Sequence, residues 1–225
     1  MKSSIITTAV LFFISTHGAN SYYQRYQDWY GSYPVTFYVS SRDRLYCWIK
    51  NLLEKIIKQI ETEWNQGASN RAVAVVRGDG INGTIWFTQD RETDPCLIQG
   101  VIQGLPPGHR GFHVHQYGDL SRGCISAGPH FNPFNKTHGG PMDRNRHTGD
   151  LGSIVVGADG VARFNITDYM VKIHGKNSVI GRAVVVHAGT DDLGRGTGHR
   201  RAESLRTGNA GARIACGVIG IAAPL

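Results

Sequence analysis

The strongest constraint on the fold of this chain is a succession of short β-type runs after residue 70, separated by turns rich in Gly, Asp and Asn. The runs AVAVVRGD and TIWFTQ flank the sequence GDGING, and this combination predicts a β-hairpin. Further runs continue the pattern: CLIQGVIQGL, GFHVHQY, SIVVGADGVARFNI, VIGRAVVVHAG and RIACGVIGIA. Glycine supplies 29 of the 225 residues, as many tight turns require. The sequence therefore predicts an all-β domain over residues 71–225.

Two segments inside this domain, 118–152 and 188–212, are rich in glycine and contain no clear strand. Segments of that length without secondary structure are uncommon in a compact domain unless they carry function. We therefore expect functional side chains in both.

The first twenty residues have the layout of a secretory signal peptide. Lys2 precedes the apolar run IITTAVLFFI, and the small and polar residues STHGANS follow. The apolar run is too short to span a membrane, and a buried core helix or strand is the alternative interpretation. We expect cleavage near residues 18–21, no other membrane-crossing segment and a secreted protein, with residues 1–20 as the signal peptide and 21–70 as an extension before the β domain.

The extension combines an aromatic-rich stretch, 22–40, with a predicted amphipathic helix over 42–65. Apolar residues recur in this helix at i, i+3, i+4 and i+7 spacing: Leu45, Trp48, Ile49, Leu52, Leu53, Ile56, Ile57, Ile60 and Trp64. Such a stripe has to be covered, and three partners are open: the β domain, a second copy of the chain, and a membrane surface. The mixed sign of the polar face disfavours the membrane surface.

The formal net charge is +7, or +6 once Lys2 is removed with the signal peptide, and the basic excess lies mostly after residue 70. This mild excess suits an anionic substrate or an acidic glycan surface. It does not require a nucleic acid partner.

Cysteines and glycosylation sequons both fit a secreted chain. An even number of cysteines favours disulfides, with three possible connectivities among the four residues: Cys47, Cys96, Cys124 and Cys216. Three sequons can accept glycans where the asparagine is exposed, and unused sequons are the alternative: Asn82, Asn135 and Asn165. A glycan on Asn135 would lie inside the first long segment.

The run GFHVHQYGDL places two histidines one residue apart. Side chains at i and i+2 share one face of a strand, so His113 and His115 project together while Phe112 and Val114 face the core. Alone, this spacing also fits a structural histidine pair. Further candidate ligands follow among glycine and proline turns: His130, His138, His147, Asp150 and His187. Imidazole nitrogens with one carboxylate suit copper and zinc, and seven ligands are too many for one tetrahedral ion, so we predict two neighbouring metal sites.

Together, several strings resemble the copper/zinc superoxide dismutase family over about residues 71–223: GFHVHQYGD, GPHFNP, HGGP, RHTGDLG, VVVHAGTDDLG and TGNAGARIACGVIGIA. The resemblance implies an eight-stranded Greek-key β-barrel of the immunoglobulin-like sandwich type, for which this family is a standard example. It implies copper held by His113, His115, His130 and His187. It implies zinc held by His130, His138, His147 and Asp150, with His130 shared.

The resemblance also implies an activity and roles for other residues. Superoxide would reduce and then reoxidise the copper, giving dioxygen and hydrogen peroxide, with His130 carrying a proton. Asp191 would link a copper ligand to a zinc ligand, and Arg213 would attract the superoxide anion, a steering effect for which this enzyme class is a standard example. For Arg213 alone, a surface salt bridge is the alternative. Cys124 and Cys216 would form a disulfide, and Tyr117 with the GVIGIA tail would form a dimer contact.

Several features depart from the family pattern. Arg110 stands where a histidine is common, and the second long segment carries His199, Arg200 and Arg201 before a single Glu203. These changes concern electrostatic guidance rather than the metal site. Cys47 and Cys96 lie outside the pattern, and we expect a second disulfide that joins the helix to the barrel.

The expected protein is an extracellular antioxidant enzyme. The rival is a non-catalytic secreted copper- or zinc-binding protein of the same fold, which the intact ligand set and Arg213 disfavour. A copper chaperone is disfavoured because the chain has no C-x-C or C-x-x-C sequence.

Overall fold

A computed structural model describes residues 41–66 and 70–223 of the chain. It divides into two compact units, residues 1–61 and 62–225, and we treat the helix and the barrel separately. The predicted signal peptide and the aromatic stretch 22–40 lie outside the described residues. Within residues 41–66 and 70–223, no helix is both long and apolar enough to cross a membrane.

The predicted amphipathic helix is present as α3, Ser41–Gln66, one residue longer at each end than expected. Apolar side chains along it are substantially exposed, including Leu45, Trp48, Ile49, Leu52 and Ile56. The helix therefore keeps an apolar stripe that nothing in the described part of the chain is shown to cover.

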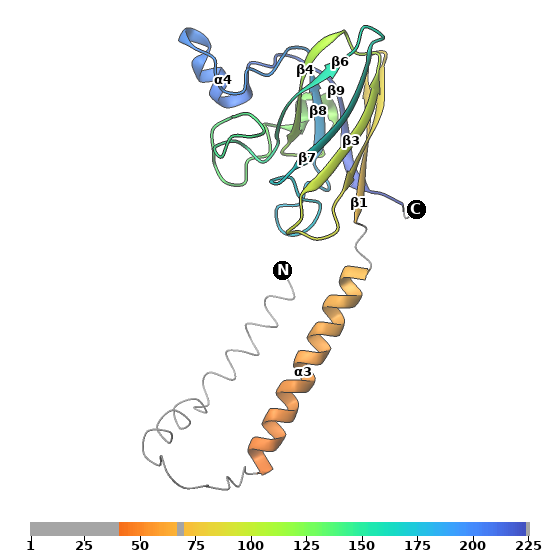
Figure 1. Cartoon of the computed structure of the whole chain (residues 1–225), viewed down its shortest axis with the longest axis vertical. Helices are drawn as coiled ribbons and strands as arrows, with labels where there is room; N and C mark the ends of the chain where they lie inside the picture. The colour runs from red at the N-terminus through yellow and green to blue at the C-terminus, as the bar shows by residue number, and fades with distance from the viewer. Residues whose placement is uncertain (1–40, 67–69, 224–225) are drawn as a thin grey trace. The chain divides into compact units, whose positions relative to one another are not determined.

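Eight strands close into a barrel in the order β1-β2-β3-β7-β6-β4-β8-β9, which confirms the predicted architecture (Figure 1). The barrel strands are β1 Arg71–Gly78, β2 Ile81–Thr88, β3 Cys96–Gln103, β4 Gly108–His115, β6 Asp150–Val156, β7 Val161–Asp168, β8 Ala183–His187 and β9 Arg213–Ile221. All neighbouring pairs are antiparallel. The predicted hairpin is β1–β2, in which Gly78 pairs with Ile81 and Gly80 takes a positive φ of 65°.

Alternation of side chains explains why these runs form strands around one core. On β1, Ala72, Ala74 and Val76 are fully buried, whereas Val75 between them is exposed. Phe87 from β2 and Phe112 from β4 are fully buried large residues of the same core. The period of two required by a half-buried strand is therefore satisfied.

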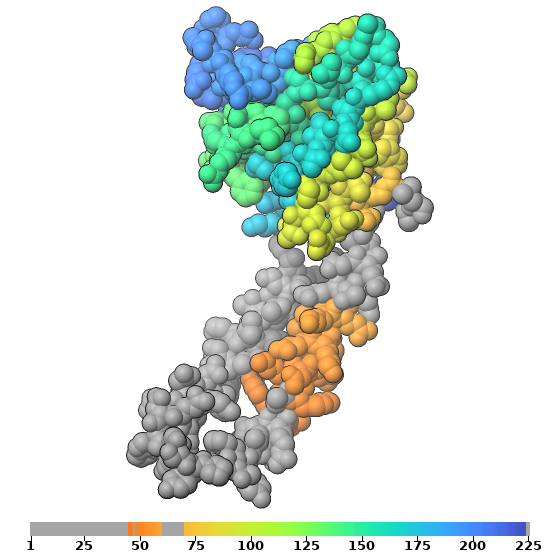
Figure 2. Space-filling view, in the orientation of Figure 1, coloured from red at the N-terminus to blue at the C-terminus, as the bar shows by residue number. Residues whose placement is uncertain are grey.

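The two long segments predicted to carry function lie between β4 and β6 and between β8 and β9. The first contains the short strand β5, Ser121–Cys124, and the 3-10 helix η1, Ile125–Ala127. The second contains η2, Gly198–Arg200, and α4, Arg201–Thr207, which projects from the barrel on the same side as the first segment (Figures 1 and 2). A backbone hydrogen bond of 2.8 Å from His138 N to Leu205 O joins them. Residues distant in sequence are thus held together at one side of the barrel.

The cysteines agree with one prediction and correct another. Cys124 and Cys216 form a disulfide across a sequence separation of 92 residues. The expected bridge between Cys47 and Cys96 is wrong, because Cys96 is a free thiol. It lies fully buried on β3 among the barrel core residues. Burial raises the pKa of this thiol to about 12.

Candidate metal centre

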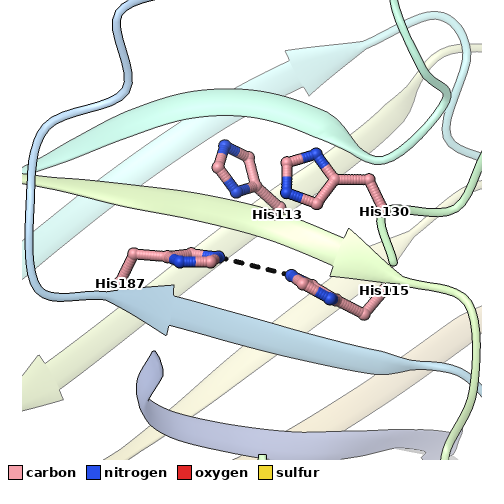
Figure 3. A group of neighbouring side chains, drawn as sticks. All are labelled: His113, His115, His130 and His187. Atoms are coloured by element: carbon pink, nitrogen blue, oxygen red, sulfur yellow. Dashed lines mark hydrogen bonds between the residues drawn. The ribbon is translucent and has the colours of Figure 1, made fainter. Parts of the chain in front are cut away.

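Four buried histidines form the first cluster, and they come from three parts of the chain (Figure 3). His113 and His115 lie on β4, and His187 ends the neighbouring strand β8. His130 belongs to the first long segment and reaches the cluster through an isolated bridge with His115. As predicted, Phe112 and Val114 turn to the core on the other face of β4.

Each ring on β4 and β8 uses one nitrogen to bond to the surrounding protein. His113 Nε2 lies 2.9 Å from Asp191 Oδ2, His115 Nδ1 lies 2.8 Å from Gly128 O, and His187 Nδ1 lies 3.1 Å from Gly211 O. The remaining nitrogens of His115 and His187 face each other at 3.3 Å, whereas His113 Nδ1 is buried without a partner. Fixing one nitrogen of a ring sets the direction of the other, as metal-binding histidines require.

The second cluster gathers three imidazoles around one carboxylate. Asp150 Oδ1 lies 2.8 Å from His130 Nδ1, 3.0 Å from His138 Nδ1 and 3.1 Å from His147 Nδ1. The approach of His138 does not have hydrogen-bond geometry, so its Nδ1 has no hydrogen-bond partner. The other carboxylate oxygen accepts hydrogen bonds from the backbone amides of Gly139, at 3.1 Å, and His147, at 2.8 Å. Asp150 is thereby fixed in orientation.

Two residues connect the clusters. His130 belongs to both: its Nδ1 meets Asp150, and its Nε2 is buried without a partner. Asp191 is also buried, and its carboxylate contacts His113 Nε2 at 2.9 Å and His138 Nε2 at 2.7 Å. The predicted link between a ring of each cluster is therefore present.

The donor atoms fit a copper site beside a zinc site. Buried polar atoms are normally hydrogen-bonded, and leaving one unpaired is costly. Four buried side-chain nitrogen or oxygen atoms of the described residues have no partner, and three of them belong to these clusters: His113 Nδ1, His130 Nε2 and His138 Nδ1. An all-imidazole set suits copper, and three imidazoles with one carboxylate suit tetrahedral zinc. Bound metal would satisfy the unpaired atoms.

The protonation states of two rings of the first cluster and of both buried carboxylates also suit metal binding. Burial lowers the pKa of His113 to about 3 and that of His187 to about 4, so both rings are neutral near pH 7. Burial alone would raise the pKa of Asp150 and Asp191, but hydrogen bonds from the histidine rings outweigh it and hold both pKa values below their usual range. Neutral imidazole and ionised carboxylate are the forms that bind metals.

We predict that the metal-free, disulfide-intact protein is most stable near pH 6.5. The unfolded pKa of histidine is about 6.5, so the lowered folded pKa values of His113 and His187 reduce stability as pH falls from 6.5 towards 4. Burial opposes protonation of His138, but Asp150 and Asp191 raise its pKa to about 9, so its stabilising effect is lost as pH rises from 6.5 to 9. Urea unfolding across this range measures the curve. A stability that rises steadily through pH 9 would contradict the prediction.

Arg213 begins β9 next to the first cluster. Its guanidinium donates to Cys124 O at 2.8 Å and to Ile125 O at 3.2 Å. The positive charge lowers the pKa of both His115 and His187, after the larger effects of burial and other neighbours. A fixed cation therefore stands beside the cluster, anchored to the residue that forms the disulfide.

The sequence did not reveal Arg146 as part of this centre. Its side chain is buried, donating to Asp150 O at 2.6 Å and to Asp168 Oδ2 at 2.6 Å. The ion pair joins the second cluster to the end of β7. A single arginine in a polar loop carries no sequence signal of burial, because its partner Asp168 lies on a distant strand.

A closed Greek-key barrel with two histidine clusters that share one imidazole defines the class: a metalloenzyme with copper beside zinc. Residues 81–219 match the family described as copper/zinc superoxide dismutase (SODC). The chain therefore belongs to the copper/zinc superoxide dismutase family. Its activity is the dismutation of superoxide, and its cofactors are copper and zinc.

Individual relatives agree with this assignment. A "Superoxide dismutase [Cu-Zn]" of Onchocerca volvulus is 57% identical over 155 residues, covering 69% of this chain and 98% of the relative. An "Extracellular superoxide dismutase [Cu-Zn]" of the same organism is 62% identical over 156 residues, covering 69% and 78%. Another of that name from Brugia pahangi is 60% identical, covering 68% and 76%. The crystal structure of the clock protein EA4 matches with a TM-score of 0.65 and 49% identity, covering 69% of this chain and 96% of that one.

Proposed function

We propose that the first cluster holds the copper and the second holds the zinc, with His130 shared between them. The copper ligands are His113, His115, His130 and His187, and the zinc ligands are His130, His138, His147 and Asp150. The observation that carries this assignment is the set of buried ring nitrogens without partners, one on the copper side, one on the zinc side and one on the shared ring.

Bound copper supplies a one-electron redox couple that amino-acid side chains lack, and bound zinc supplies a fixed positive charge. In the overall reaction, two superoxide anions and two protons give dioxygen and hydrogen peroxide. Arg213 attracts the anion and orients it beside the first cluster. His130 holds a proton at Nε2, the atom that faces the first cluster, and gives it to the reduced oxygen species. Asp191 keeps the rings of His113 and His138 in place.

Single ligand substitutions should separate the two metals. We expect His187→Ala to lose its copper while keeping zinc, and His147→Ala to lose its zinc, because each residue belongs to one cluster only. His109→Ala is the control, since His109 is exposed and outside both clusters. Metal content after dialysis, measured by mass spectrometry, checks this. Equal loss of both metals in every variant, or retention of both, would contradict the ligand assignment.

We also propose that the chain is secreted and acts as an antioxidant outside the cell. The support is the N-terminal run of Lys2 and IITTAVLFFI, together with two relatives that are named extracellular. The N-terminal residue of the exported chain tests this, with a start near residues 18–21 expected and an intact Met1 contradicting it. Exposed sequon asparagines at positions 82, 135 and 165 are compatible with glycosylation of such a chain.

Homodimer formation is the expected assembly of the barrel. Exposed apolar residues of the barrel include Tyr117, Ile125, Val218 and Ile221. Val218 lies close to the residue after Tyr117, because its Cγ1 is 3.2 Å from the position of a β-carbon on Gly118. Tyr117 and the GVIGIA tail were predicted as the contact from the family resemblance. A second copy of the chain would bury these side chains.

We predict that α3 associates with α3 of other subunits and enlarges the assembly. Leu45, Ile49, Leu52 and Ile56 recur at alternating spacings of four and three residues and are exposed, a pattern typical of a helix–helix seam. Leu52→Glu with Ile56→Glu in the full chain should lower the mass measured by light scattering. Lys55→Gln on the same helix is the control. An unchanged mass in the double variant would remove self-association through α3.

A further inference from the structure

Arg110 lies on β4, three residues before the copper ligand His113, and its guanidinium contacts three main-chain carbonyls. Nε donates to Pro106 O at 3.0 Å, and Nη2 donates to Pro107 O at 2.6 Å. Nη1 donates to Ala188 O. The first two acceptors belong to the β3–β4 connection, and the third follows the copper ligand His187 directly. One side chain therefore joins two loops, and its farthest acceptor in sequence, Ala188 O, lies 78 residues from Arg110.

The segment after His187 is held on both sides. Gly111 N donates to Gly189 O at 2.8 Å from the β4 side, and Ala188 N donates to Ala212 O at 2.8 Å on the other side. The register between β8 and β9 shifts at this point, between Val186 and His187. The regular hydrogen bonds between β8 and β9 are therefore not sufficient to fix the end of β8. The contacts of the residues that follow His187 help to determine the direction of its side chain.

Packing at Gly111 leaves little room for His187 to adjust. A β-carbon on Gly111 would lie 2.7 Å from Ala210 Cβ and 3.3 Å from both His187 Cβ and His113 Cε1. The copper ligands thus sit tightly against the backbone next to Arg110. A shift of Ala188 by a few tenths of an ångström has to move the ring of His187 as well.

We propose that Arg110 is a positioning residue for the copper site: it clamps the backbone after His187 to the β3–β4 connection and so fixes the direction of the His187 ring. The inference rests on the proposed assignment of His187 as a copper ligand. The guanidinium suits this task because its donors form a rigid planar fork, whereas a lysine ammonium carries the same charge on a single nitrogen. All three nitrogens of Arg110 are directed to carbonyl oxygens, so its role is to bridge them rather than to present charge to solvent. This role replaces the expectation that the residue at this position concerns electrostatic guidance and not the metal site.

The test compares Arg110→Lys, Arg110→Ala and the control Arg163→Ala in the full, copper- and zinc-loaded protein. Arg163 is an exposed arginine on β7 that pairs with Asp159 and belongs to neither metal cluster. The first readout is the rate of copper transfer to an external chelator, with the electron paramagnetic resonance spectrum of Cu(II). The second is hydrogen exchange of residues 183–190 in the metal-free protein.

We expect copper loss to be about tenfold faster in both Arg110 variants, because removing a residue that supports a metal ligand typically costs 10- to 100-fold in metal affinity. In both Arg110 variants the Cu(II) spectrum should change and the amides of residues 183–190 should exchange faster, while zinc is retained as in the wild type. Arg163→Ala should match the wild type in every readout. Arg110→Lys should not restore the wild-type rate of copper loss. The inference is overturned if Arg110→Lys matches the wild type, if zinc is lost as fast as copper, or if no variant differs.

A wrong ligand assignment would give results that differ from those of a wrong clamp proposal. If His187 is not a copper ligand, His187→Ala would keep its copper, or the wild type would bind no copper at the first cluster. Hydrogen exchange in the metal-free variants would then still decide whether Arg110 holds the segment after His187: faster exchange supports the clamp, and unchanged exchange removes it.

Discussion

Arg213→Ala should lower the rate constant for superoxide decay by roughly tenfold to a hundredfold at low ionic strength, since steering of a charged substrate typically raises association rates by factors of 10 to 1,000. The guanidinium is fixed by the carbonyls of Cys124 and Ile125, and its charge is felt at His115 and His187. The substitution removes this fixed cation without removing a metal ligand. Copper and zinc contents should therefore stay unchanged while the rate falls.

Ionic strength distinguishes steering from damage to the site. The wild-type rate should fall as salt is added, because a Debye length of about 10 Å at 0.1 M screens the attraction. The variant should show a weaker dependence, and Arg213→Lys should keep part of it because the charge remains. A wild-type rate that does not respond to salt, or a variant that keeps the full rate, would contradict the role assigned to Arg213.

The second large effect is expected from the disulfide. Replacing both cysteines, Cys124→Ala with Cys216→Ala, should reduce the free energy of unfolding by about 4–5 kcal/mol, as loop-closure entropy predicts for a loop of this length. The bridge spans 92 residues and ties the first long segment to β9. It also holds Cys124, whose carbonyl anchors Arg213. The double variant should therefore lose stability and part of its superoxide decay rate together.

Urea unfolding of the metal-free double variant and of the metal-free wild type, under identical conditions, measures the difference in the free energy of unfolding. Reduction of the wild-type bridge under non-denaturing conditions provides an independent comparison and should give the same direction of change. A loss below about 1 kcal/mol would show that the bridge does not constrain the unfolded chain as this entropy argument requires.

Much of the fold and the site could be predicted from the sequence because local patterns determine them. The GDGING turn between alternating runs specifies the β1–β2 hairpin, and the spacing of His113 and His115 specifies a shared face of β4. The hairpin and the shared face depend on neighbours in sequence, which a single chain displays directly. The division of the other ligands into two clusters was instead implied by the resemblance of the strings around them to the copper/zinc superoxide dismutase family.

The features that could not be predicted depend on contacts between distant strands. Cys96 is a free, fully buried thiol rather than half of a second disulfide, and its burial follows from the closure of the barrel around β3. The Arg146–Asp168 ion pair joins residues that are 22 positions apart. The contact of Arg110 with the carbonyl of Ala188 joins residues that are 78 positions apart. Nothing in the neighbouring sequence of an arginine says which carbonyl or carboxylate it meets.

The measurement that tests the central claim most directly is superoxide decay in the presence of the full chain loaded with copper and zinc, followed by stopped-flow absorbance. Our account predicts rapid catalytic decay in the loaded wild type, slower decay in Arg213→Ala and none above background in His187→Ala. Both metals bound in stoichiometric amounts without accelerated decay would contradict it. The two clusters would then belong to a metal-binding protein of the same fold rather than to an enzyme.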